Sequence, residues 1–218
     1  MMKIEIWSDV VCPWCYIGKR RFEKALAQYE HADEVEITWR SFELDPSAPR
    51  VQTEPHAERL SRKYGVSLAQ VATMNQRLIG EAKKEGLAFN LDEAKGGNTF
   101  DAHRLIHLAA ESDRAGEMKE RLMKAYFTEG VPIGERAELV RLAMETGLEE
   151  AEVKAMLSSD RFANDVRSDE ARARGFGIGG VPFFAIDEQF GVSGAQPADV
   201  LLDALRQAYA NSQSAEVS

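Results

Sequence analysis

Cysteine is scarce in this sequence, with only Cys12 and Cys15 among 218 residues. Two cysteines can supply at most half of a four-ligand zinc site. A structural disulfide is a second interpretation, but a bridge that closes so small a loop adds little stability. In a third interpretation, the two cysteines are ordinary thiols of the hydrophobic core. The three-residue spacing is the most distinctive feature of the chain, and we expect the pair to serve redox chemistry.

Long hydrophobic runs are also absent. No apolar stretch reaches the roughly 18 residues that a transmembrane helix needs. The first six residues lack the long apolar region of a signal peptide, and Glu5 interrupts their apolar stretch. We therefore expect a cytoplasmic enzyme. An unmarked export route, or a mature chain whose signal had been removed, would give the same sequence pattern.

Positive charge is in short supply. The chain has 27 Lys and Arg residues against 36 Asp and Glu, which gives a formal net charge of −9 at pH 7. Binding to phosphate groups draws on clustered Lys and Arg, so we expect neither nucleic acid nor an anionic membrane as a partner. With 44% hydrophobic residues, the chain can form one good core plus an elaboration.

The two cysteines belong to the motif Cys12-Pro13-Trp14-Cys15, between an expected strand and an expected helix. Residues 3–7 alternate in hydrophobicity like a strand, and apolar residues recur at helical spacing after Cys15. Proline is favoured at the first helical position. Pro13 is therefore predicted there, with Cys12 as the N-cap and Cys15 as the third helical residue. Side chains three apart on a helix are neighbours and come within reach of a disulfide after modest adjustment.

This placement predicts different roles for the two thiols. The positive end of the helix dipole favours a thiolate at Cys12, which we expect to be partly exposed and to attack a substrate. Cys15 begins the apolar stripe of the helix, so we expect it to be buried and to resolve the intermediate. A CxxC motif after a strand is typical of thioredoxin-like proteins.

The remaining strands and helices follow in a simple order. A second strand is expected over 35–44, and a hairpin over 181–187 and 190–194, followed by a helix that opens at Pro197. The polar residues 211–218 are expected to be frayed. Helical periodicity fills the interval between the second and third strands, with segments near 55–64, 67–85, 99–112, 116–128, 135–146, 149–158 and 160–174.

The predicted fold class is α/β. When the helical segments are set aside, the strands and helices that remain correspond to a thioredoxin-like core. A large all-helical insertion then joins the second strand to the third. The expected domains are a discontinuous thioredoxin-like domain, residues 1–45 with 175–218, and a helical insertion domain, residues 46–174.

Four motifs are spread over nearly the whole chain: Cys-Pro-Trp-Cys-Tyr-Ile-Gly at 12–18, Asn98-Thr99 with Ala102-His103-Arg104-Leu105, Gly180-Val181-Pro182-Phe183-Phe184, and Gly194-Ala195-Gln196-Pro197. In this order they resemble the DsbA family, in its FrnE-like branch. The resemblance implies a thioredoxin-fold dithiol–disulfide oxidoreductase. Close relatives include 2-hydroxychromene-2-carboxylate isomerase and kappa-class glutathione transferases, which typically have serine at the position of Cys12.

The resemblance also implies a substrate-binding surface around the motif. Pro182 is expected in a cis peptide bond that faces the two cysteines, with Val181 offering its backbone to an extended substrate. The other interpretation is that Pro182 begins an edge strand, where proline is tolerated. Pro13 and Trp14, between the cysteines, belong to the same expected surface.

Asn98, Thr99 and His103 are expected on the face of the insertion that covers the cysteines, again from the resemblance. The alternative for Asn98 is a helix N-cap. His103 also lies four residues before His107, which is the spacing of a metal pair. A Cys2His2 zinc site is therefore the alternative for His103, and a surface or core histidine is the commoner one.

One position departs from the family pattern. Related proteins carry a buried acid six residues before the first cysteine, where it helps to move the proton of the buried thiol, but here that residue is Ile6. Asp9 is a candidate substitute, and a turn-forming Asx residue is the alternative. Trp14 takes the place of the histidine of strongly oxidising relatives, so the dithiol pair is expected to oxidise less strongly.

Together the motifs favour a thiol–disulfide oxidoreductase that needs no metal and no organic cofactor. Its expected partners are protein or small-molecule thiols and disulfides, with glutathione as a candidate. Two other functions stay open: a glutathione-dependent isomerase or transferase of the 2-hydroxychromene-2-carboxylate isomerase or kappa type, and a chaperone that holds clients. The oxidoreductase needs two redox-active thiols, the isomerase needs at most one, and the chaperone needs none.

Overall fold

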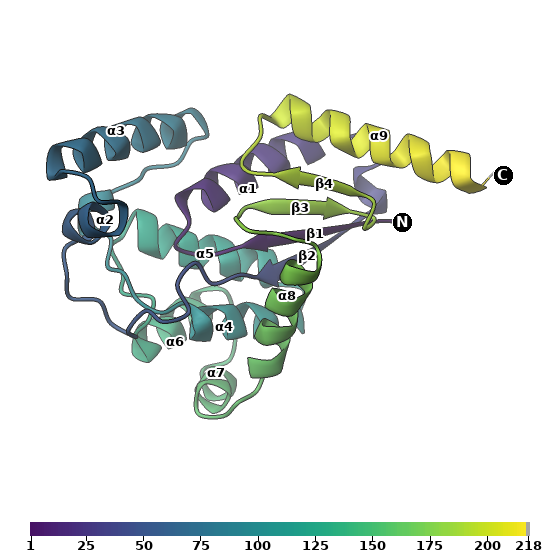
Figure 1. Cartoon of the computed structure of the whole chain (residues 1–218). Coiled ribbons are helices and arrows are strands. Elements are labelled where there is room, and N and C mark those ends of the chain that lie inside the picture. Colours follow the sequence, from purple (N-terminus) through teal and green to yellow (C-terminus); the bar gives the residue numbers. More distant parts are fainter. Residues whose placement is uncertain (217–218) are drawn as a thin grey trace.

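The computed structural model describes residues 1–216, and its centre is a mixed sheet of four strands in the order β2-β1-β3-β4 (Figure 1). The strands are β1 (Met2–Ser8), β2 (Val35–Ser41), β3 (Phe183–Ile186) and β4 (Phe190–Ser193). β2 runs parallel to β1, while β3 pairs antiparallel with both β1 and β4. Segments from the two ends of the chain therefore share one sheet, as the sequence predicts.

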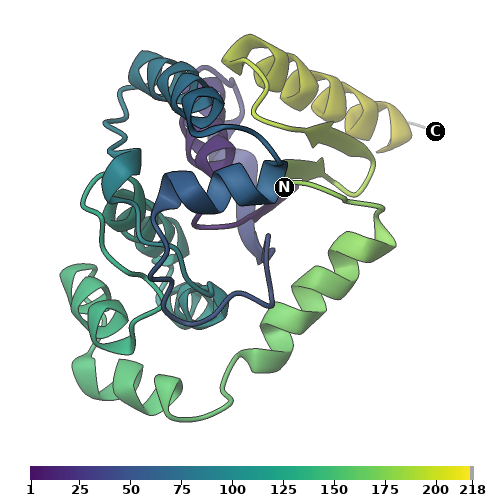
Figure 2. The same cartoon turned by 60° about the vertical axis from the view of Figure 1, so that its left-hand side comes forward.

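Helices surround this sheet. α1 (Pro13–Leu26) follows β1, and α9 (Ala198–Glu216) follows β4. Short 3-10 turns precede β2 and α4, at Ala32–Glu34 and Leu91–Glu93. The helical block between β2 and β3 consists of α2 (His56–Tyr64), α3 (Leu68–Lys84), α4 (Phe100–Ala110), α5 (Ala115–Phe127), α6 (Arg136–Glu145), α7 (Glu150–Leu157) and α8 (Ala163–Gly175). In Figure 2, α2 lies in the foreground near the centre of the view, below α3 and to the left of α8.

Helices cover both faces of the sheet, and the side chains of β1 point alternately to one face and the other. Ile4 and Ile6 are buried on the face that α1 and α9 cover. Trp7 points to the opposite face, where it is buried with Ala173 of α8. β1 pairs with β2 on one side and β3 on the other, so the most buried strand lies inside the sheet.

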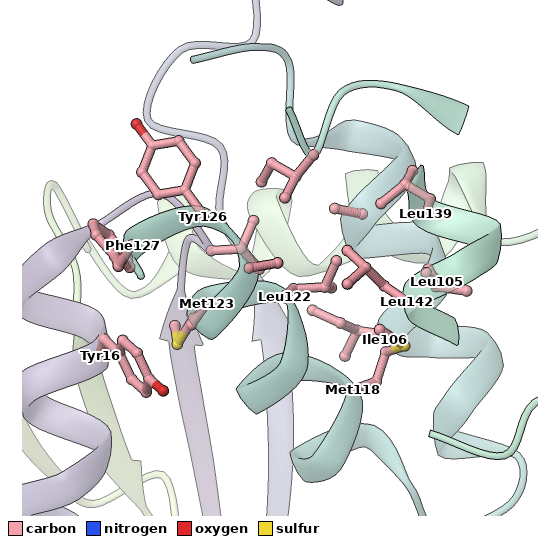
Figure 3. Packing of buried hydrophobic residues seen from close by; sticks show 14 of the residues in the cluster. Tyr16, Leu105, Ile106, Met118, Leu122, Met123, Tyr126, Phe127, Leu139 and Leu142 are labelled. Atoms are coloured by element: carbon pink, nitrogen blue, oxygen red, sulfur yellow. The ribbon is translucent and has the colours of Figure 1, made fainter. Parts of the chain in front are cut away.

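The N-terminal half of α1 packs into the helical block. Cys15 and Tyr16 lie in the same hydrophobic cluster as buried side chains of α4 to α7. Tyr16 lies beside Met123 and Phe127 of α5 (Figure 3), and its ring centroid is 6.0 Å from that of Phe127. The block therefore packs directly against the turn that carries the two cysteines.

Every helical segment predicted for the block is present, but three strands are shorter than predicted: β4 by one residue, and β2 and β3 by more. β2 stops before Leu44, because the backbone N–H of Leu44 donates to the carboxylate of Asp9 at 2.8 Å instead of to a strand. β3 begins at Phe183, since the preceding Pro182 has no N–H to give to the ladder. Both differences occur where the chain turns toward the cysteine motif.

The C-terminal helix is longer than predicted. α9 continues to Glu216, so the expectation of a frayed tail is wrong for 211–216, while 217–218 lie outside the described residues. One cause is the ring of Tyr209, which stacks on His31 with 4.0 Å between the ring centroids and holds the last turns against the body of the protein. Between residues 1 and 216, no helix has both the length and the hydrophobicity that crossing a bilayer requires. The division of the chain into two domains stays a prediction.

Candidate active site

The two cysteines occupy the first turn of α1, as the sequence predicts. Pro13 is the first helical residue, Cys12 is the N-cap with an extended backbone (φ −89°, ψ 113°), and Cys15 is the third residue. The backbone N–H of Cys15 donates to the carbonyl of Cys12 at 3.0 Å. Both side chains are free thiols, and they lie close enough for Cys12 to raise the pKa of Cys15. The turn therefore brings the two sulfur atoms together.

Within the motif, Trp14 is exposed to solvent, whereas both cysteines are buried. Trp14 is 44% exposed, whereas Cys12 and Cys15 are 5% and 2% exposed. The expectation that Cys12 is partly exposed is therefore wrong, while the predicted burial of Cys15 is confirmed. The cause is the carbonyl of Val181, which covers Cys12: the Cys12 sulfur donates a hydrogen bond to that oxygen at 3.6 Å.

The surroundings of Cys15 make its thiol hard to ionise. Burial raises the pKa of Cys15 well above its usual range, and the hydrogen bond and charge of Cys12 raise it further. A hydrogen bond from the Asp9 backbone and the charge of Lys119 act in the opposite direction. Among its neighbours, Asp9 and Lys119 are therefore the ones that favour the ionised form of Cys15.

A loop from the far end of the chain faces the cysteines. The Val181–Pro182 peptide bond is cis, as the family resemblance implies. The carbonyl of Pro182 accepts from the N–H of Gly194 at 2.8 Å, and the proline ring packs on Gly18 of α1. Because β3 lies between β1 and β4, the alternative in which Pro182 begins an edge strand is wrong. Helix α1 and this loop together enclose the Cys12 sulfur.

Beside the motif lies a buried pair of ionisable side chains, Asp9 and His103. His103 Nε2 is 3.2 Å from Asp9 Oδ1, and both side chains are 1% exposed. The backbone carbonyl of Asp9 accepts from the N–H of Cys12 at 3.2 Å, which connects the pair to the motif. Asp9 Oδ2 accepts from the N–H of Leu44. Asp9 therefore opens the turn before Cys12 through its backbone, as the turn-forming alternative predicts, while its carboxylate makes long-range contacts.

Asn98 and Thr99 lie where α4 begins. Thr99, and not Asn98, is the N-cap of α4, so the N-cap alternative for Asn98 is wrong by one residue. Asn98 still serves the helix end, because its Oδ1 accepts from the N–H of Phe100 at 2.9 Å. Its Nδ2 donates to Glu43 and to the carbonyl of Pro46, which ties α4 to the segment after β2. Contact of either residue with a substrate stays a prediction.

The two histidines of α4 have separate partners. His103 contacts Asp9, whereas His107 Nε2 is 3.1 Å from both Ser41 Oγ and Asp169 Oδ2. Within residues 1–216, no group of three or more His, Cys, Asp or Glu side chains is arranged to hold a metal ion. Both imidazoles are therefore engaged by carboxylates, which is a different arrangement from the Cys2His2 alternative.

Sequence reasoning missed Lys119 of α5, a buried lysine in the surroundings of Cys15. Lys119 is 1% exposed, and its Nζ lies 5.2 Å from the centroid of the Trp39 ring. Burial lowers the pKa of Lys119 to about 8, although the charges of Cys15 and Asp9 act to raise it. A signal was present, because Lys119 stands three residues before the buried Leu122, within the apolar stripe of α5.

Glu120, the next residue of α5, fastens this helix to α1. Its carboxylate accepts from Tyr16 Oη at 2.5 Å, from Lys19 Nζ at 2.8 Å and from the guanidinium of Arg20. Burial opposes ionisation of Glu120, but these three donors outweigh it and hold the pKa of Glu120 at about 2. The resulting clamp fixes α5 against the helix of the two cysteines, and the sequence pattern alone did not indicate it.

Comparison with known proteins places this arrangement in a family. Residues 3–206 match the DSBA-like thioredoxin domain. The structure is similar to that of the probable DsbA oxidoreductase SCO1869 from Streptomyces coelicolor, with a TM-score of 0.93 and 44% sequence identity over 96% of this chain and 91% of that one. YwbO, an uncharacterized protein of Bacillus subtilis, is 32% identical over 205 residues, which are 93% of this chain and 94% of YwbO.

A more distant structure shares the fold alone. The cytosolic disulfide reductase DsbM from Pseudomonas aeruginosa with GSH has a TM-score of 0.67 and 18% identity, over 94% of this chain and 98% of that one. The family match, by contrast, extends over both cysteines, the helical block and the Val181–Pro182 loop. The chain therefore belongs to the DSBA-like thioredoxin domain family of thiol oxidoreductases, which confirms both the DsbA resemblance and the thioredoxin-like α/β fold predicted from its motifs.

Proposed function

We propose that the protein is a dithiol–disulfide oxidoreductase in which Cys12 attacks a disulfide and Cys15 resolves the intermediate. The observation that carries this proposal is the pair of free, mutually interacting thiols at the N-cap and third residue of α1. This pair meets the requirement for two thiols that can form a bond with each other. The thiol chemistry of the family supports the same function.

The proposed reaction begins at Cys12. Its thiolate forms a bond to one sulfur of the substrate disulfide while the substrate S–S bond breaks, and the second substrate sulfur leaves as a thiolate that takes up a proton. Cys15 then loses its proton and attacks the Cys12 sulfur. The Cys12–Cys15 disulfide forms, the mixed disulfide breaks, and the first substrate sulfur leaves as a thiol. Two electrons pass from the protein to the substrate, and the reverse sequence oxidises a dithiol.

The proposed substrate-binding surface surrounds the Cys12 sulfur. Trp14 supplies an exposed apolar side chain next to it, with Pro13 at the same turn. The backbone of Val181, held beside Pro182, supplies a hydrogen-bonding edge to which an extended peptide can add. Asn98, Thr99 and His103 belong to the proposed surface on the side of the helical block.

The proposed substrates are protein or small-molecule disulfides. Glutathione is the candidate small thiol, since the DsbM structure that shares this fold is one with GSH. We also propose the cytoplasm as the location, which is the compartment named for DsbM. A thiol such as glutathione would return the Cys12–Cys15 disulfide to the dithiol form.

Equilibration in glutathione redox buffers tests the proposed function. As the buffer becomes more oxidising, we expect the wild-type protein to lose two hydrogen atoms per chain, measured by mass spectrometry after acid quenching, with one midpoint that gives the reduction potential. Cys12→Ser and Cys15→Ser serve as controls that cannot form this bond. A wild-type protein that stays a dithiol in every buffer, or that only accepts glutathione on Cys12, would contradict the proposal.

The isomerase alternative has its own test. A glutathione-dependent isomerase needs at most one thiol of the protein, so the double variant Cys12→Ser, Cys15→Ser would still turn over a small aromatic ligand in the presence of glutathione. We expect no such turnover. Sustained multiple turnover by the double variant would favour the isomerase and would make the dithiol reaction a side activity.

A further inference from the structure

Lys119 is a buried charge that the thiol chemistry described so far does not use. We infer that Lys119, which the helical block supplies, is a positioning residue for the resolving step, in which its ammonium stabilises the thiolate of Cys15. The inference rests on the proposed function and names a further residue for it.

The fold fixes Lys119 opposite the first turns of α1. The neighbouring Glu120 bonds to Tyr16 and Lys19, which follow Cys15 by one and four positions in α1. The clamp therefore holds this turn of α5 against the first turns of α1, and Lys119, buried in the same turn of α5, interacts electrostatically with Cys15. This placement comes from the clamp between two helices and does not depend on any loop.

β2 closes the other side of Lys119. Trp39 presents its ring to the ammonium at 5.2 Å, within the range of a cation–π contact. Gly116 of α5 also lies beside Trp39, since a Cβ atom there would be 3.4 Å from Trp39 Nε1. Lys119 is therefore enclosed by α1, β2 and its own helix.

The enclosed ammonium lacks an ion-pair partner at contact distance. Among the ion pairs of residues 1–216, those of Lys19 involve Glu23 and Glu120, whereas none involves Lys119. An ammonium taken out of water is destabilised unless a negative charge compensates it. A group that becomes negative next to Lys119 is therefore stabilised by the charge already present.

Of the negative groups around Lys119, Cys15 is the one whose charge changes during the reaction. Asp9 is already paired with His103, and Asp169 with Arg40 and His107. The charged groups that act on Lys119 are Cys15 and Lys19 on α1, Asp9 after β1 and Asp169 on α8. The partners of these groups are Cys12 for Cys15, Glu120 for Lys19, His103 for Asp9, and Arg40 and His107 for Asp169.

Bonds and protons balance in the resolving step, and Lys119 is not consumed. The S–H bond of Cys15 breaks, the bond between the Cys15 and Cys12 sulfurs forms, and the bond between Cys12 and the substrate sulfur breaks. The departing substrate thiolate takes up one proton, which matches the proton that Cys15 loses. Lys119 keeps its three protons and acts only through its charge.

Stopped-flow mixing of the reduced protein with the aromatic disulfide dithiobis(nitrobenzoate) separates the two steps. Attack by Cys12 releases one coloured thionitrobenzoate at a rate proportional to the reagent concentration. Attack by Cys15 on the resulting mixed disulfide releases the second at a rate independent of that concentration. The pH profile of the second phase therefore reports the ionisation of Cys15.

For Lys119→Met we expect the second phase to slow about threefold to tenfold at pH 7, where Lys119, with a pKa of about 8, still carries its charge. Loss of a charge that lowers the pKa of Cys15 by about one unit reduces the thiolate fraction about tenfold, while the more basic thiolate is a better nucleophile and recovers part of the rate. Above about pH 8 the difference from the wild type should shrink, because Lys119 itself loses its charge there. The first phase should stay unchanged. Lys119→Arg keeps the charge and should keep the rate at pH 7, and Lys124→Met, at an exposed position of the same helix, is the matched control.

Three results would overturn the inference. The first is a second phase in Lys119→Met that matches the wild-type rate at pH 7. The second is an equal slowing in Lys119→Arg. The third is the same slowing in Lys124→Met. Lys119→Gln, with the expectations of Lys119→Met, takes its place if the methionine variant does not fold by circular dichroism. Absence of the second phase in the wild type would instead refute the proposed function.

Discussion

Trp14 offers the simplest test of the substrate-binding surface at the level of one residue. It is 44% exposed, so replacement by alanine should change the free energy of unfolding by less than about 0.5 kcal/mol. We expect Trp14→Ala to slow the reaction with a protein disulfide about tenfold, the loss that about 1.4 kcal/mol of contact energy produces. Insulin reduction followed by turbidity measures the rate.

Val200 on α9 provides the matched control for Trp14, because it is an apolar residue with the same 44% exposure. Val200→Ala should leave both the rate and the stability unchanged. An unchanged rate in Trp14→Ala would remove this side chain from the substrate-binding surface. An equal loss in both variants would point to a general effect of surface hydrophobicity.

Single residues were predictable from the sequence where local spacing decides their place. Cys12, Pro13 and Cys15 occupy the helical positions that the preference of proline for the first turn indicates. Local spacing does not reveal contacts between distant segments. Asp9 and His103 were each candidates, but their contact joins residues 94 positions apart. Lys119 was missed because lysine is rarely buried, so only the neighbouring apolar residues signalled its place.

Gly18 tests how closely α1 approaches the Val181–Pro182 loop. A Cβ atom at Gly18 would lie 2.9 Å from Pro182 Cγ and 3.4 Å from Ala195 Cβ, and a proline ring atom cannot swing aside like the end of a flexible side chain. We expect Gly18→Ala to push the helix and the loop apart, with a loss of about 1–3 kcal/mol in the free energy of unfolding. Urea denaturation followed by circular dichroism measures the loss.

Gly80 in α3 is the matched control for this substitution. It lies inside a helix, and a Cβ atom there would meet no heavy atom within 4 Å. Gly80→Ala should therefore stabilise the protein by about 0.5–1 kcal/mol through helix propensity. A Gly18→Ala variant as stable as Gly80→Ala would show that the contact between α1 and the loop is not close.

The clamp between α5 and α1 can be tested through the pH dependence of the stability that Glu120 contributes. The pKa of Glu120 is lowered from 4.5 to about 2, so its ionised form stabilises the folded protein fully above about pH 4.5, and this contribution is lost as the pH falls toward 2. We expect Glu120→Gln to cost on the order of 2–3 kcal/mol at pH 7, a difference that narrows below about pH 4.5. Urea denaturation between pH 7 and pH 2.5 measures it.

Glu150 provides the control for this pH series. It forms an exposed pair with Lys154 on α7, and an exposed pair of this kind contributes little to stability. Glu150→Gln should therefore leave the free energy of unfolding nearly unchanged at every pH. A cost of Glu120→Gln that stays constant down to pH 2.5 would show that the carboxylate charge is not the source of the clamp.

Helix bounds were predictable because glycine and proline mark them, but helix packing was not. Gly65 and Gly147, both with positive φ, follow the C-terminal ends of α2 and α6, close to the predicted ends of these helices. The contact of α5 with α1 depends on Glu120 and three donors that lie 100 to 104 residues away. Pattern analysis of one segment at a time cannot identify such partners. The sequence therefore predicted a helical cover without predicting which helix meets Cys15.

At the scale of the whole molecule, α1 joins the sheet and the helical block. Tyr16 and Ile17 belong to the hydrophobic cluster of the block, whereas Phe22 and Ala25 belong to the cluster under α9. Because one helix lies in both clusters, we expect the thioredoxin-like part and the insertion to unfold in a single cooperative transition.

Coincident urea curves test this expectation. Tryptophan fluorescence, to which Trp7 and Trp39 contribute from the sheet, should have the same midpoint as far-ultraviolet circular dichroism, which the helices dominate. Two separate midpoints would show that residues 46–174 unfold independently of the sheet.

The division of labour between the two cysteines is tested most directly by trapping the mixed disulfide. Mixed with a protein disulfide, the Cys15→Ser variant should accumulate a covalent complex through Cys12, seen on a non-reducing gel and by mass spectrometry and released by dithiothreitol. Cys12→Ser should form no complex, because a serine hydroxyl is not ionised at neutral pH. If Cys15→Ser instead turns the substrate over at the wild-type rate with no covalent complex, then Cys15 does not resolve the intermediate and the dithiol mechanism is wrong.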